Sequence, residues 1–312
     1  MINLEKLKNE KPILELLNFG ILNIDKPAGM TSFDVVNAVR KSLGLKKCGH
    51  FGTLDPNVTG VLPIALGNAC KVQEYFMHHE KTYIGTMQLH KPTTLEKLES
   101  EMKKFIGKIN QLPPRISRVK RQIRQREVIE FKILKFDEKK KTADFIAEVE
   151  AGTYIRKLID DLGKGISGAQ MISLRRIKAG IFSDKDNEFV SLADFEKAAD
   201  EYKRGKANIL RRLITPAEII TKILPIVEVN EEALKKLKNG SPIFSEMLED
   251  EKKAIPENSF AVFFKDIIVE IAKKVEEPIS RQHFQNIQER DLNANARENP
   301  NILARPEVVI YT

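Results

Sequence analysis

The order of strand-like and helix-like segments constrains the fold of this 312-residue chain more than any other feature of its sequence. Over roughly the first 215 residues the two kinds of segment mix without the regular strand–helix–strand alternation of a doubly wound parallel sheet. Apolar or alternating runs predict strands at 20–24, 61–66, 81–90, 128–137 and 142–150. Helical spacing of apolar residues predicts helices at 32–43, 94–106, 154–162 and 168–174. This mixture predicts an α+β fold class.

Two prolines mark the expected domain boundary. A polar lead-in segment with loose helical spacing occupies residues 1–19, and the α+β domain is expected at 20–215. Pro216 and Pro225 then bracket a short helical stretch. Residues 225–312 predict a small β-rich domain, with strands at 226–229, 260–264, 267–271 and 307–311 and a polar, loop-like stretch at 276–301.

Charge is unevenly placed along the chain. The 52 Lys and Arg against 44 Asp and Glu leave a formal net charge of +8. Residues 103–135 alone hold eleven Lys or Arg and two Asp or Glu, a local charge of +9. Such a concentration favours a surface that binds nucleic acid, because each neutralised phosphate releases a counterion. The alternative is a solvated surface that acidic side chains balance elsewhere in space.

Composition argues against several other classes of protein. The chain has no run of about 18 apolar residues that would predict a membrane-spanning helix, and residues 1–11 are too charged for a secretory signal. Two cysteines, Cys48 and Cys70, cannot build a disulfide framework or a four-ligand zinc site. The five histidines have no spacing typical of metal ligands. We therefore expect a cytoplasmic protein without a metal or other cofactor.

Residues 163–168 match the G-x-G-x-x-G of dinucleotide-binding loops letter for letter. That fingerprint needs a strand before it and a helix after it. Here the preceding residues 155–162 have helical spacing, so we interpret the glycines as a helix end followed by a turn.

The Gly-bounded loop at residues 50–60 carries most of the chemical information. Taken alone, Asp55 before Pro56 is typical of a turn, because an Asp carboxylate can accept hydrogen bonds from backbone amides two residues further on. Arg156 lies where an expected strand gives way to a helix, and it could pair with a carboxylate. Both a turn and a functional carboxylate are compatible with this pattern.

Five motifs in this order resemble those of the TruB family of RNA pseudouridine synthases: 25–32 (Asp-Lys-Pro-Ala-Gly-Met-Thr-Ser), 52–56 (Gly-Thr-Leu-Asp-Pro), 81–83 (Lys-Thr-Tyr), 152–156 (Gly-Thr-Tyr-Ile-Arg) and 174–176 (Leu-Arg-Arg). Within the family the chain is more similar to the archaeal and eukaryotic branch, the dyskerin-type catalytic subunits of H/ACA guide-RNA particles. This similarity rests on residues 55–60, 111–114 and 118–126 and on the short link between His90 and Phe105. The resemblance implies a mixed, mainly antiparallel sheet at 20–215 and a PUA-like RNA-binding domain at 225–312.

The resemblance also implies roles for single residues. Asp55 would be the catalytic carboxylate, which either attacks the uridine or removes its 2′ proton. Arg156 would pair with Asp55 and favour its ionised form. Tyr83 would stack on the target base, and Leu174 would form the apolar wall opposite.

Further residues complete the two implied binding sets. The substrate-binding set also includes His50, Tyr154 and Lys26, and the RNA-binding set comprises Arg118, Lys120, Arg121, Arg124 and Arg126. A purely structural turn is an equal alternative for Lys26 and Pro27. Phe51 stands where the family usually has Ser or Thr, which predicts a reshaped pocket edge.

The implied reaction breaks the N1–C1′ bond of uridine and rejoins the sugar to C5 of the same base. A carboxylate, a stacking ring and an apolar wall suffice, so no cofactor is implied. The target uridine must leave its stack before it can react. The implied partners are target rRNA or tRNA, an H/ACA guide RNA, and Nop-type, Gar-type and kink-turn-binding proteins. A stand-alone tRNA T-loop synthase and a non-catalytic RNA-binding scaffold are the alternatives.

Overall fold

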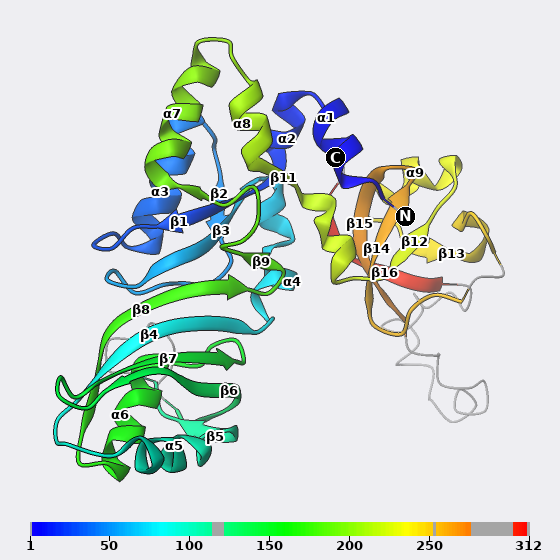
Figure 1. Ribbon diagram of the computed structural model, residues 1–312. Coiled ribbons are helices and arrows are strands. Elements are labelled where there is room, and N and C mark those ends of the chain that lie inside the picture. Colours follow the sequence, from blue (N-terminus) through cyan, green and yellow to red (C-terminus); the bar gives the residue numbers. More distant parts are fainter. Residues whose placement is uncertain (1, 114–121, 252–253, 276–301, 311–312) are drawn as a thin grey trace, which may run out of the picture. The chain divides into compact units, whose positions relative to one another are not determined.

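The computed structural model describes residues 2–113, 122–251, 254–275 and 302–310 of the chain (Figure 1). The chain divides into two compact units. One unit is formed by Lys11–Ala217, and the other combines Met1–Glu10 with Glu218–Thr312. The division therefore falls inside the expected lead-in segment 1–19.

The larger unit is built on an 11-stranded sheet with the order β10-β1-β3-β8-β4-β7-β6-β5, to which β2, β9 and β11 add short pairings. Its strands are β1 (Phe19–Lys26), β2 (Cys48–His50), β3 (Thr59–Gly67), β4 (Lys81–Leu89), β5 (Gly107–Gln111), β6 (Arg124–Asp137), β7 (Thr142–Val149), β8 (Ala169–Ala179), β9 (Phe182–Ser183), β10 (Val190–Ser191) and β11 (Ile214–Pro216). The pairs β1–β10 and β3–β8 are parallel and the other pairs are antiparallel. The predicted α+β fold with a mixed, mainly antiparallel sheet is confirmed.

Helices pack against this sheet at both ends of the unit. They are α2 (Ile13–Asn18), α3 (Ser32–Ser42), η1 (Asn68–Lys71), α4 (Gln73–Met77), α5 (Leu95–Lys103), α6 (Ile155–Gly165), α7 (Leu192–Lys203) and α8 (Asn208–Leu213). In Figure 1, α3, α7 and α8 lie at the end formed by β1 and β3, whereas α5 and α6 lie at the end formed by β5–β7. Helix α3 begins with a capping box between Thr31 and Asp34, as the polar residues before its apolar stripe predict.

Residues 168–174 do not form the helix expected from their spacing. Residues 169–174 belong to β8 and pair antiparallel with β4. Along β8, Leu174 and Arg176 are buried while Arg175 between them is not, which is the period of two of a strand. A short segment of this kind does not distinguish a helix from a strand by itself, and the pairing with β4 decides the outcome.

The glycines at 163–168 form a helix end and a turn, as interpreted. Helix α6 ends at Gly165, and a strand follows, not the helix that a dinucleotide fingerprint requires. Gly168 has a φ of 112°, and a Cβ atom there would lie 2.3 Å from Nδ1 of His90. The glycine therefore permits a close passage of the chain beside His90.

The smaller unit contains a five-stranded sheet with the order β12-β14-β15-β16-β13. Its elements are α1 (Leu4–Glu10), η2 (Ala217–Lys222), β12 (Ile226–Glu228), α9 (Glu231–Leu237), β13 (Ile243–Phe244), η3 (Ser245–Met247), β14 (Ser259–Phe264), β15 (Ile267–Lys274) and β16 (Ile302–Val309). The β-rich character predicted here is confirmed, although β16 begins before the expected 307–311. The predicted loop at 276–301 lies outside the described residues. No helix in the described ranges has the length and apolar character needed to cross a membrane.

Candidate active site

Asp55 lies in the loop of residues 51–58 between β2 and β3, which we call the Asp55 loop. The N–H of Val58 donates to the carbonyl of Asp55 over 3.0 Å, so Asp55 opens a turn. Leu54 and Val58 are buried in the core, whereas the Asp55 side chain is 53% exposed. The apolar side chains thus anchor the loop while its carboxylate faces solvent.

The Asp55 carboxylate forms an ion pair with Arg156 in the first turn of α6, 101 residues further along the chain. Both side chains are 53% exposed. Exposed ion pairs contribute only about 0–1 kcal/mol to stability. The pair therefore matters more for the direction in which the carboxylate points than for the stability of the fold.

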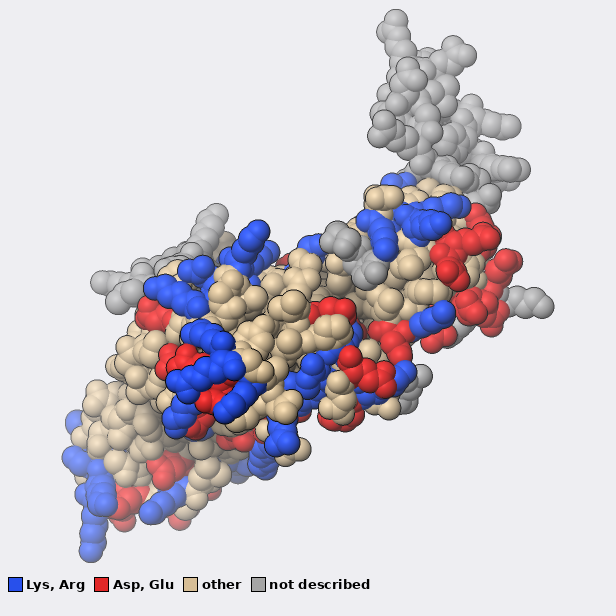
Figure 2. Space-filling view, turned by 90° about the horizontal axis from the view of Figure 1, so that it is seen from above, with Lys and Arg blue, Asp and Glu red and all other residues tan. Residues whose placement is uncertain are grey.

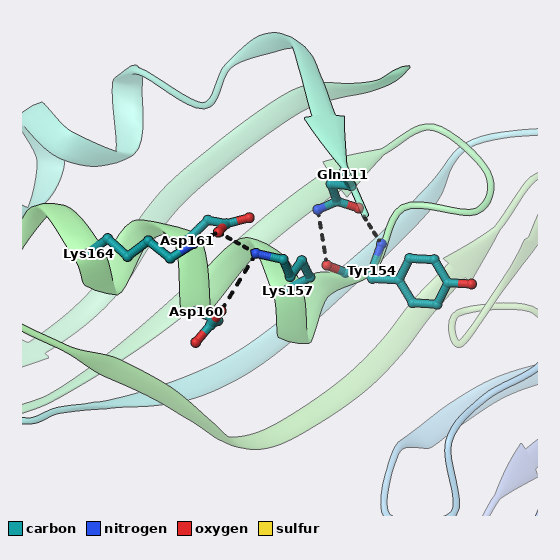
Figure 3. Close-up of polar contacts among 6 residues, drawn as sticks. All are labelled: Gln111, Tyr154, Lys157, Asp160, Asp161 and Lys164. Atoms are coloured by element: carbon teal, nitrogen blue, oxygen red, sulfur yellow. Dashed lines mark hydrogen bonds and ion pairs between the residues drawn. The ribbon is translucent and has the colours of Figure 1, made fainter. Parts of the chain in front are cut away.

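The start of α6 is held by Gln111 at the end of β5 (Figure 3). Gln111 donates from Nε2 to the carbonyl of Tyr154 over 3.2 Å and accepts from the Tyr154 N–H over 3.0 Å. Gln111 is 2% exposed, and Tyr154 is the N-cap residue of α6. The amide group thus fixes the turn that presents Arg156. Its role depends on a partner 43 residues away, so the sequence pattern did not identify it.

The next turns of α6 are linked by charged side chains that do not involve the Asp55 loop. Lys157 contacts Asp161 and lies 3.6 Å from Asp160, and Lys164 donates to Asp161 over 2.5 Å (Figure 3). These i,i+3 and i,i+4 pairs support the helix that carries Arg156.

Tyr83 and Leu174 are buried on neighbouring strands, β4 and β8. Leu174 lies opposite Gly85, which is two residues from Tyr83 and therefore on the same face of β4. A Cβ atom on Gly85 would come within 2.6 Å of the Ser173 carbonyl and 3.0 Å of Leu174 Cδ1. Because Gly85 has no side chain, the Leu174 side chain has room to lie against β4 at this position.

A buried guanidinium binds the start of the Asp55 loop and the strand β3 that follows it. Arg176 is 1% exposed and donates from Nη2 to the Gly52 carbonyl over 3.0 Å and from Nε to the Val61 carbonyl over 2.8 Å. Sequence reasoning noted Arg176 only as part of a motif. Its place two residues after Leu174 in the same motif was the available signal, but its partners lie 124 and 115 residues earlier in the chain.

Two further basic side chains lie near Arg176. Lys81 is buried and donates to the carbonyls of Met77 and His79. Burial, with a contribution from the Arg176 charge, lowers the pKa of Lys81 to about 8. Burial and then Arg176 also lower the pKa of His50 at the end of β2. His50 Nδ1 is buried with no hydrogen-bond partner among the described residues.

Lys26 is fully buried and contacts the Asp55 loop. Its Nζ donates to the carbonyls of Pro27, over 2.7 Å, and Pro56, over 2.8 Å. Burial lowers the pKa of Lys26, and the negative charge of Asp55 opposes this shift. The geometry thus gives Lys26 a contact with the loop next to Asp55.

Phe51 points into the core and not toward a pocket edge, so that expectation is wrong. Its ring stacks on Phe76 with centroids 4.8 Å apart and meets Phe182 at 5.8 Å. Phe51 is 1% exposed. An aromatic cluster of this kind explains the residue by packing.

Two of the five predicted RNA-binding residues, Arg124 and Arg126, lie among the described residues. Arg118, Lys120 and Arg121 lie outside the described residues. Arg124 and Arg126 lie on β6, next to the edge strand β5. Arg126 is 3.5 Å from Glu150 and lies against Gly152, so its charge is partly balanced. On the face seen in Figure 2, Lys and Arg side chains gather in several groups with Asp and Glu between them.

Among the described residues, no three His, Cys, Asp or Glu side chains cluster as the ligands of a metal ion would. What the geometry does bring together is a carboxylate with a guanidinium, Asp55 with Arg156, and an aromatic ring with an apolar side chain, Tyr83 with Leu174, on adjacent strands.

Two family models match consecutive parts of the chain. The N-terminal domain of TruB family pseudouridylate synthases matches residues 40–155. The C-terminal domain of tRNA pseudouridylate synthase B matches residues 156–222. Asp55 and Tyr83 lie in the first match, and Arg156 and Leu174 lie in the second.

Several archaeal proteins are similar in sequence. "Probable tRNA pseudouridine synthase B" of Korarchaeum cryptofilum (strain OPF8) is 39% identical over 237 residues, which are 75% of this chain and 72% of that protein. The protein of the same name from Methanopyrus kandleri (strain AV19) is 38% identical over 259 residues, 82% of this chain and 75% of that protein.

Solved structures extend the similarity to nearly the whole chain. A chain of the "Cbf5-Nop10-Gar1 Complex" has a TM-score of 0.80 and 32% identity, covering 97% of this chain and 88% of that one. A chain of the "H/ACA RNP bound to a substrate RNA containing 2'-deoxyuridine" has a TM-score of 0.78 and 30% identity, covering 98% of this chain and 89% of that one. The two family matches, the archaeal relatives and these solved structures together show that the chain belongs to the TruB family of pseudouridylate synthases, enzymes that isomerise uridine in RNA.

Proposed function

We propose that the chain converts specific uridines in RNA to pseudouridine with Asp55 as the catalytic carboxylate. We further propose that it acts as the catalytic subunit of a guide-RNA-directed H/ACA particle on rRNA and tRNA. The observation that carries the first proposal is the ion pair between Asp55 and Arg156, which directs a half-exposed carboxylate in a loop that Leu54 and Val58 anchor in the core.

The residues around Asp55 can divide the reaction between them. The N1–C1′ bond of the uridine breaks, C1′ bonds to C5, C5 loses its hydrogen as a proton and N1 takes up a proton. Asp55 either attacks the uridine and is released when C1′ bonds to C5, or removes the 2′ proton and returns it. Arg156 holds the carboxylate in one direction in both cases. Tyr83 stacks on the released base and Leu174 covers its other side, so that the base can rotate without leaving the pocket.

Support for a guide-directed particle comes from the solved structures, whose titles name Cbf5, Nop10, Gar1 and an H/ACA particle. The proposed partners are therefore a guide RNA, Nop10-like and Gar1-like proteins and a kink-turn-binding protein. A stand-alone enzyme acting on tRNA is the second candidate, because the archaeal relatives carry the name tRNA pseudouridine synthase B. In either case residues 20–215, after the lead-in 1–19, would form the catalytic domain, and residues 225–312 would bind RNA.

Release of tritium from C5-labelled uridine tests the function, because forming the C5–C1′ bond must expel the C5 hydrogen. The purified chain is assayed first on a tRNA transcript, and then with an H/ACA guide RNA, the partner proteins and a matching target. Asp55→Asn should abolish release. Asp160→Asn, which changes an exposed carboxylate on α6 that contacts Lys157 and not Arg156, is the control and should retain it.

The two assay arms separate the candidates. Release with the chain alone supports the stand-alone enzyme, and release only with guide RNA and partner proteins supports the particle. Equal release by wild type and Asp55→Asn would exclude Asp55 as the catalytic residue, and no release in either arm would leave the scaffold alternative.

A further inference from the structure

The backbone on either side of Asp55 is hydrogen-bonded to one segment, residues 26–32. The Leu54 N–H donates to Ser32 Oγ over 2.8 Å, and Ser32 Oγ donates to the Leu54 carbonyl over 3.1 Å. The Pro56 carbonyl accepts from Lys26 Nζ over 2.8 Å and from the Gly29 N–H over 3.0 Å. Because proline has no N–H, every backbone polar group of the two residues that flank Asp55 is bonded to this segment.

Arg156 sets the direction in which the Asp55 carboxylate points, but this exposed contact does not by itself fix the place of the side chain. The Asp55 side chain is half exposed, and its side-chain partner is Arg156, which is equally exposed. The position of the carboxylate is therefore set mainly by the backbone that carries it. Leu54 and Pro56 determine where that backbone lies.

Ser32 is suited to fix the backbone before Asp55. It is 1% exposed, so water cannot readily replace its hydroxyl group. It occupies the first position of α3. A hydroxyl group that both accepts from and donates to one residue leaves that residue no freedom to turn away from the helix.

We propose that Ser32 is a positioning residue that holds the Asp55 carboxylate in its reactive place by fixing the backbone of Leu54. The proposal rests on the catalytic role proposed for Asp55. Ser32 acts through Leu54, and misplacing a reacting group by about 1 Å can lower a rate on the order of 100-fold.

The test compares Ser32→Ala with Thr31→Ala in the full-length chain. The two substitutions change adjacent residues at the same helix start. Ser32→Ala removes both bonds to Leu54, whereas Thr31→Ala removes the bond from the Asp34 N–H, 3.0 Å long, and leaves Leu54 untouched. In the assay arm that shows wild-type release, Ser32→Ala should lower kcat by about 10- to 100-fold with KM changed little. Thr31→Ala should retain the wild-type kcat.

Thermal unfolding midpoints of both variants are measured so that kcat is compared where each is fully folded. If Ser32→Ala and Thr31→Ala have the same kcat, the positioning role is overturned. In that outcome the function proposed for Asp55 still stands, provided that Asp55→Asn is inactive.

Amide hydrogen exchange tests the anchoring independently of activity, and its wild-type measurement does not depend on whether Ser32→Ala folds. In the wild-type chain the Leu54 N–H should exchange slowly, and in Ser32→Ala it should exchange faster while the Asp34 N–H keeps its protection. Fast exchange of Leu54 in the wild type would overturn the proposal even if the enzyme is active. A protected Leu54 in an inactive wild type would instead place the failure with the proposed function.

Discussion

Asp55 and Arg156 form an exposed ion pair whose contribution to folding and to catalysis should differ strongly. We expect Arg156→Lys to change the unfolding free energy by less than about 1 kcal/mol, because exposed pairs add little stability. The same change should lower the rate of tritium release about 100-fold or more, because an ammonium cannot reproduce the directed contact of a guanidinium. Single-turnover release and urea unfolding measure the two effects. A rate loss that only matches a large stability loss would contradict this expectation.

Glu270 on β15 should make the smaller unit sensitive to pH. Its side chain is fully buried, and both carboxylate oxygens have no hydrogen-bond partner among the described residues. Burial raises the pKa of Glu270 from 4.5 to about 8. Between these values the folded state keeps a proton that the unfolded state has lost, so the contribution of Glu270 to stability should be most favourable below pH 4.5 and should fall as pH rises to about 8.

Glu270→Gln should remove this part of the pH dependence, whereas Glu231→Gln, an exposed change in the first turn of α9, should leave it unchanged. Exchange protection factors of the β14 and β15 amides, measured from pH 5 to pH 8 and corrected for intrinsic rates, report the stability of this unit. Protection that is constant with pH in the wild type would show that Glu270 is already charged or bonded in the fold.

At the residue scale, the sequence predicted side chains whose chemistry stands out and missed those whose role depends on a distant partner. Asp55 and Arg156 lie in short motifs that can be recognised locally, and the structure joins them in an ion pair. Gln111 and Arg176 hold the same site through carbonyl and amide groups 43 and 124 residues away. A hydrogen bond to backbone needs only a polar side chain in the right place, so composition and spacing gave no signal for it.

At the element scale, the strand β8 shows where local patterns fail. Residues 168–174 have spacing compatible with a helix, and only the pairing of 169–174 with β4 makes them part of a strand. The strands predicted at 128–137 and 142–150, in contrast, follow from their own apolar patterns, and they form the antiparallel pair of β6 and β7. Local patterns decide an element when its partner is the next segment, and fail when its partner lies far along the chain.

The close pairing of β4 with β8 depends on Gly85. A Cβ atom there would lie 2.6 Å from the Ser173 carbonyl and 2.8 Å from the Phe145 ring. The clash with the carbonyl involves backbone, so no side-chain rotation can relieve it. We expect Gly85→Ala to destabilise the larger unit by about 1–3 kcal/mol through overpacking and to lower activity by displacing Leu174. Urea unfolding followed by circular dichroism and tritium release measure the two effects.

Gly107→Ala is the control for backbone strain alone. Gly107 has a φ of 91°, but a Cβ atom there meets nothing within 4 Å. Gly107→Ala should therefore lower the unfolding free energy by about 1 kcal/mol, because alanine is strained at this φ, and should leave tritium release intact. If Gly85→Ala is tolerated as well as Gly107→Ala, the sheet can move apart at this point and Leu174 does not depend on Gly85.

At the scale of the whole molecule, the expected two-part organisation and the observed units differ at their limits. Pro216 and Pro225 suggested a boundary at 215–225, and the units divide after Ala217. The lead-in 1–19 was treated as one segment, but residues up to Glu10 group with the C-terminal unit. Turn residues mark a boundary along the chain, whereas the assignment of an N-terminal helix depends on which core it packs against.

The salt dependence of RNA binding should distinguish an effect of the net charge of the whole chain from an effect of the basic segment around β6. The net charge is +8. Each phosphate that the protein no longer neutralises should make the slope of log K against log salt shallower by about 0.9 for duplex and 0.7 for single-stranded RNA, taking the values for DNA. We expect Arg121→Glu with Arg124→Glu to weaken binding and to flatten the slope by the equivalent of about one to two phosphates. Arg126→Gln should have a smaller effect, because Glu150 lies 3.5 Å from its guanidinium.

Lys203→Glu with Arg204→Glu, at the exposed end of α7, makes the same change in net charge and is the matched control. Titration of a fluorescent RNA at several salt concentrations measures the slopes of all variants. If the control flattens the slope as much as the pair at Arg121 and Arg124, RNA responds to the field of the whole molecule. A smaller effect of the control places the phosphate-binding side chains on the segment around β6, because screening at physiological salt confines a charge to about 8 Å.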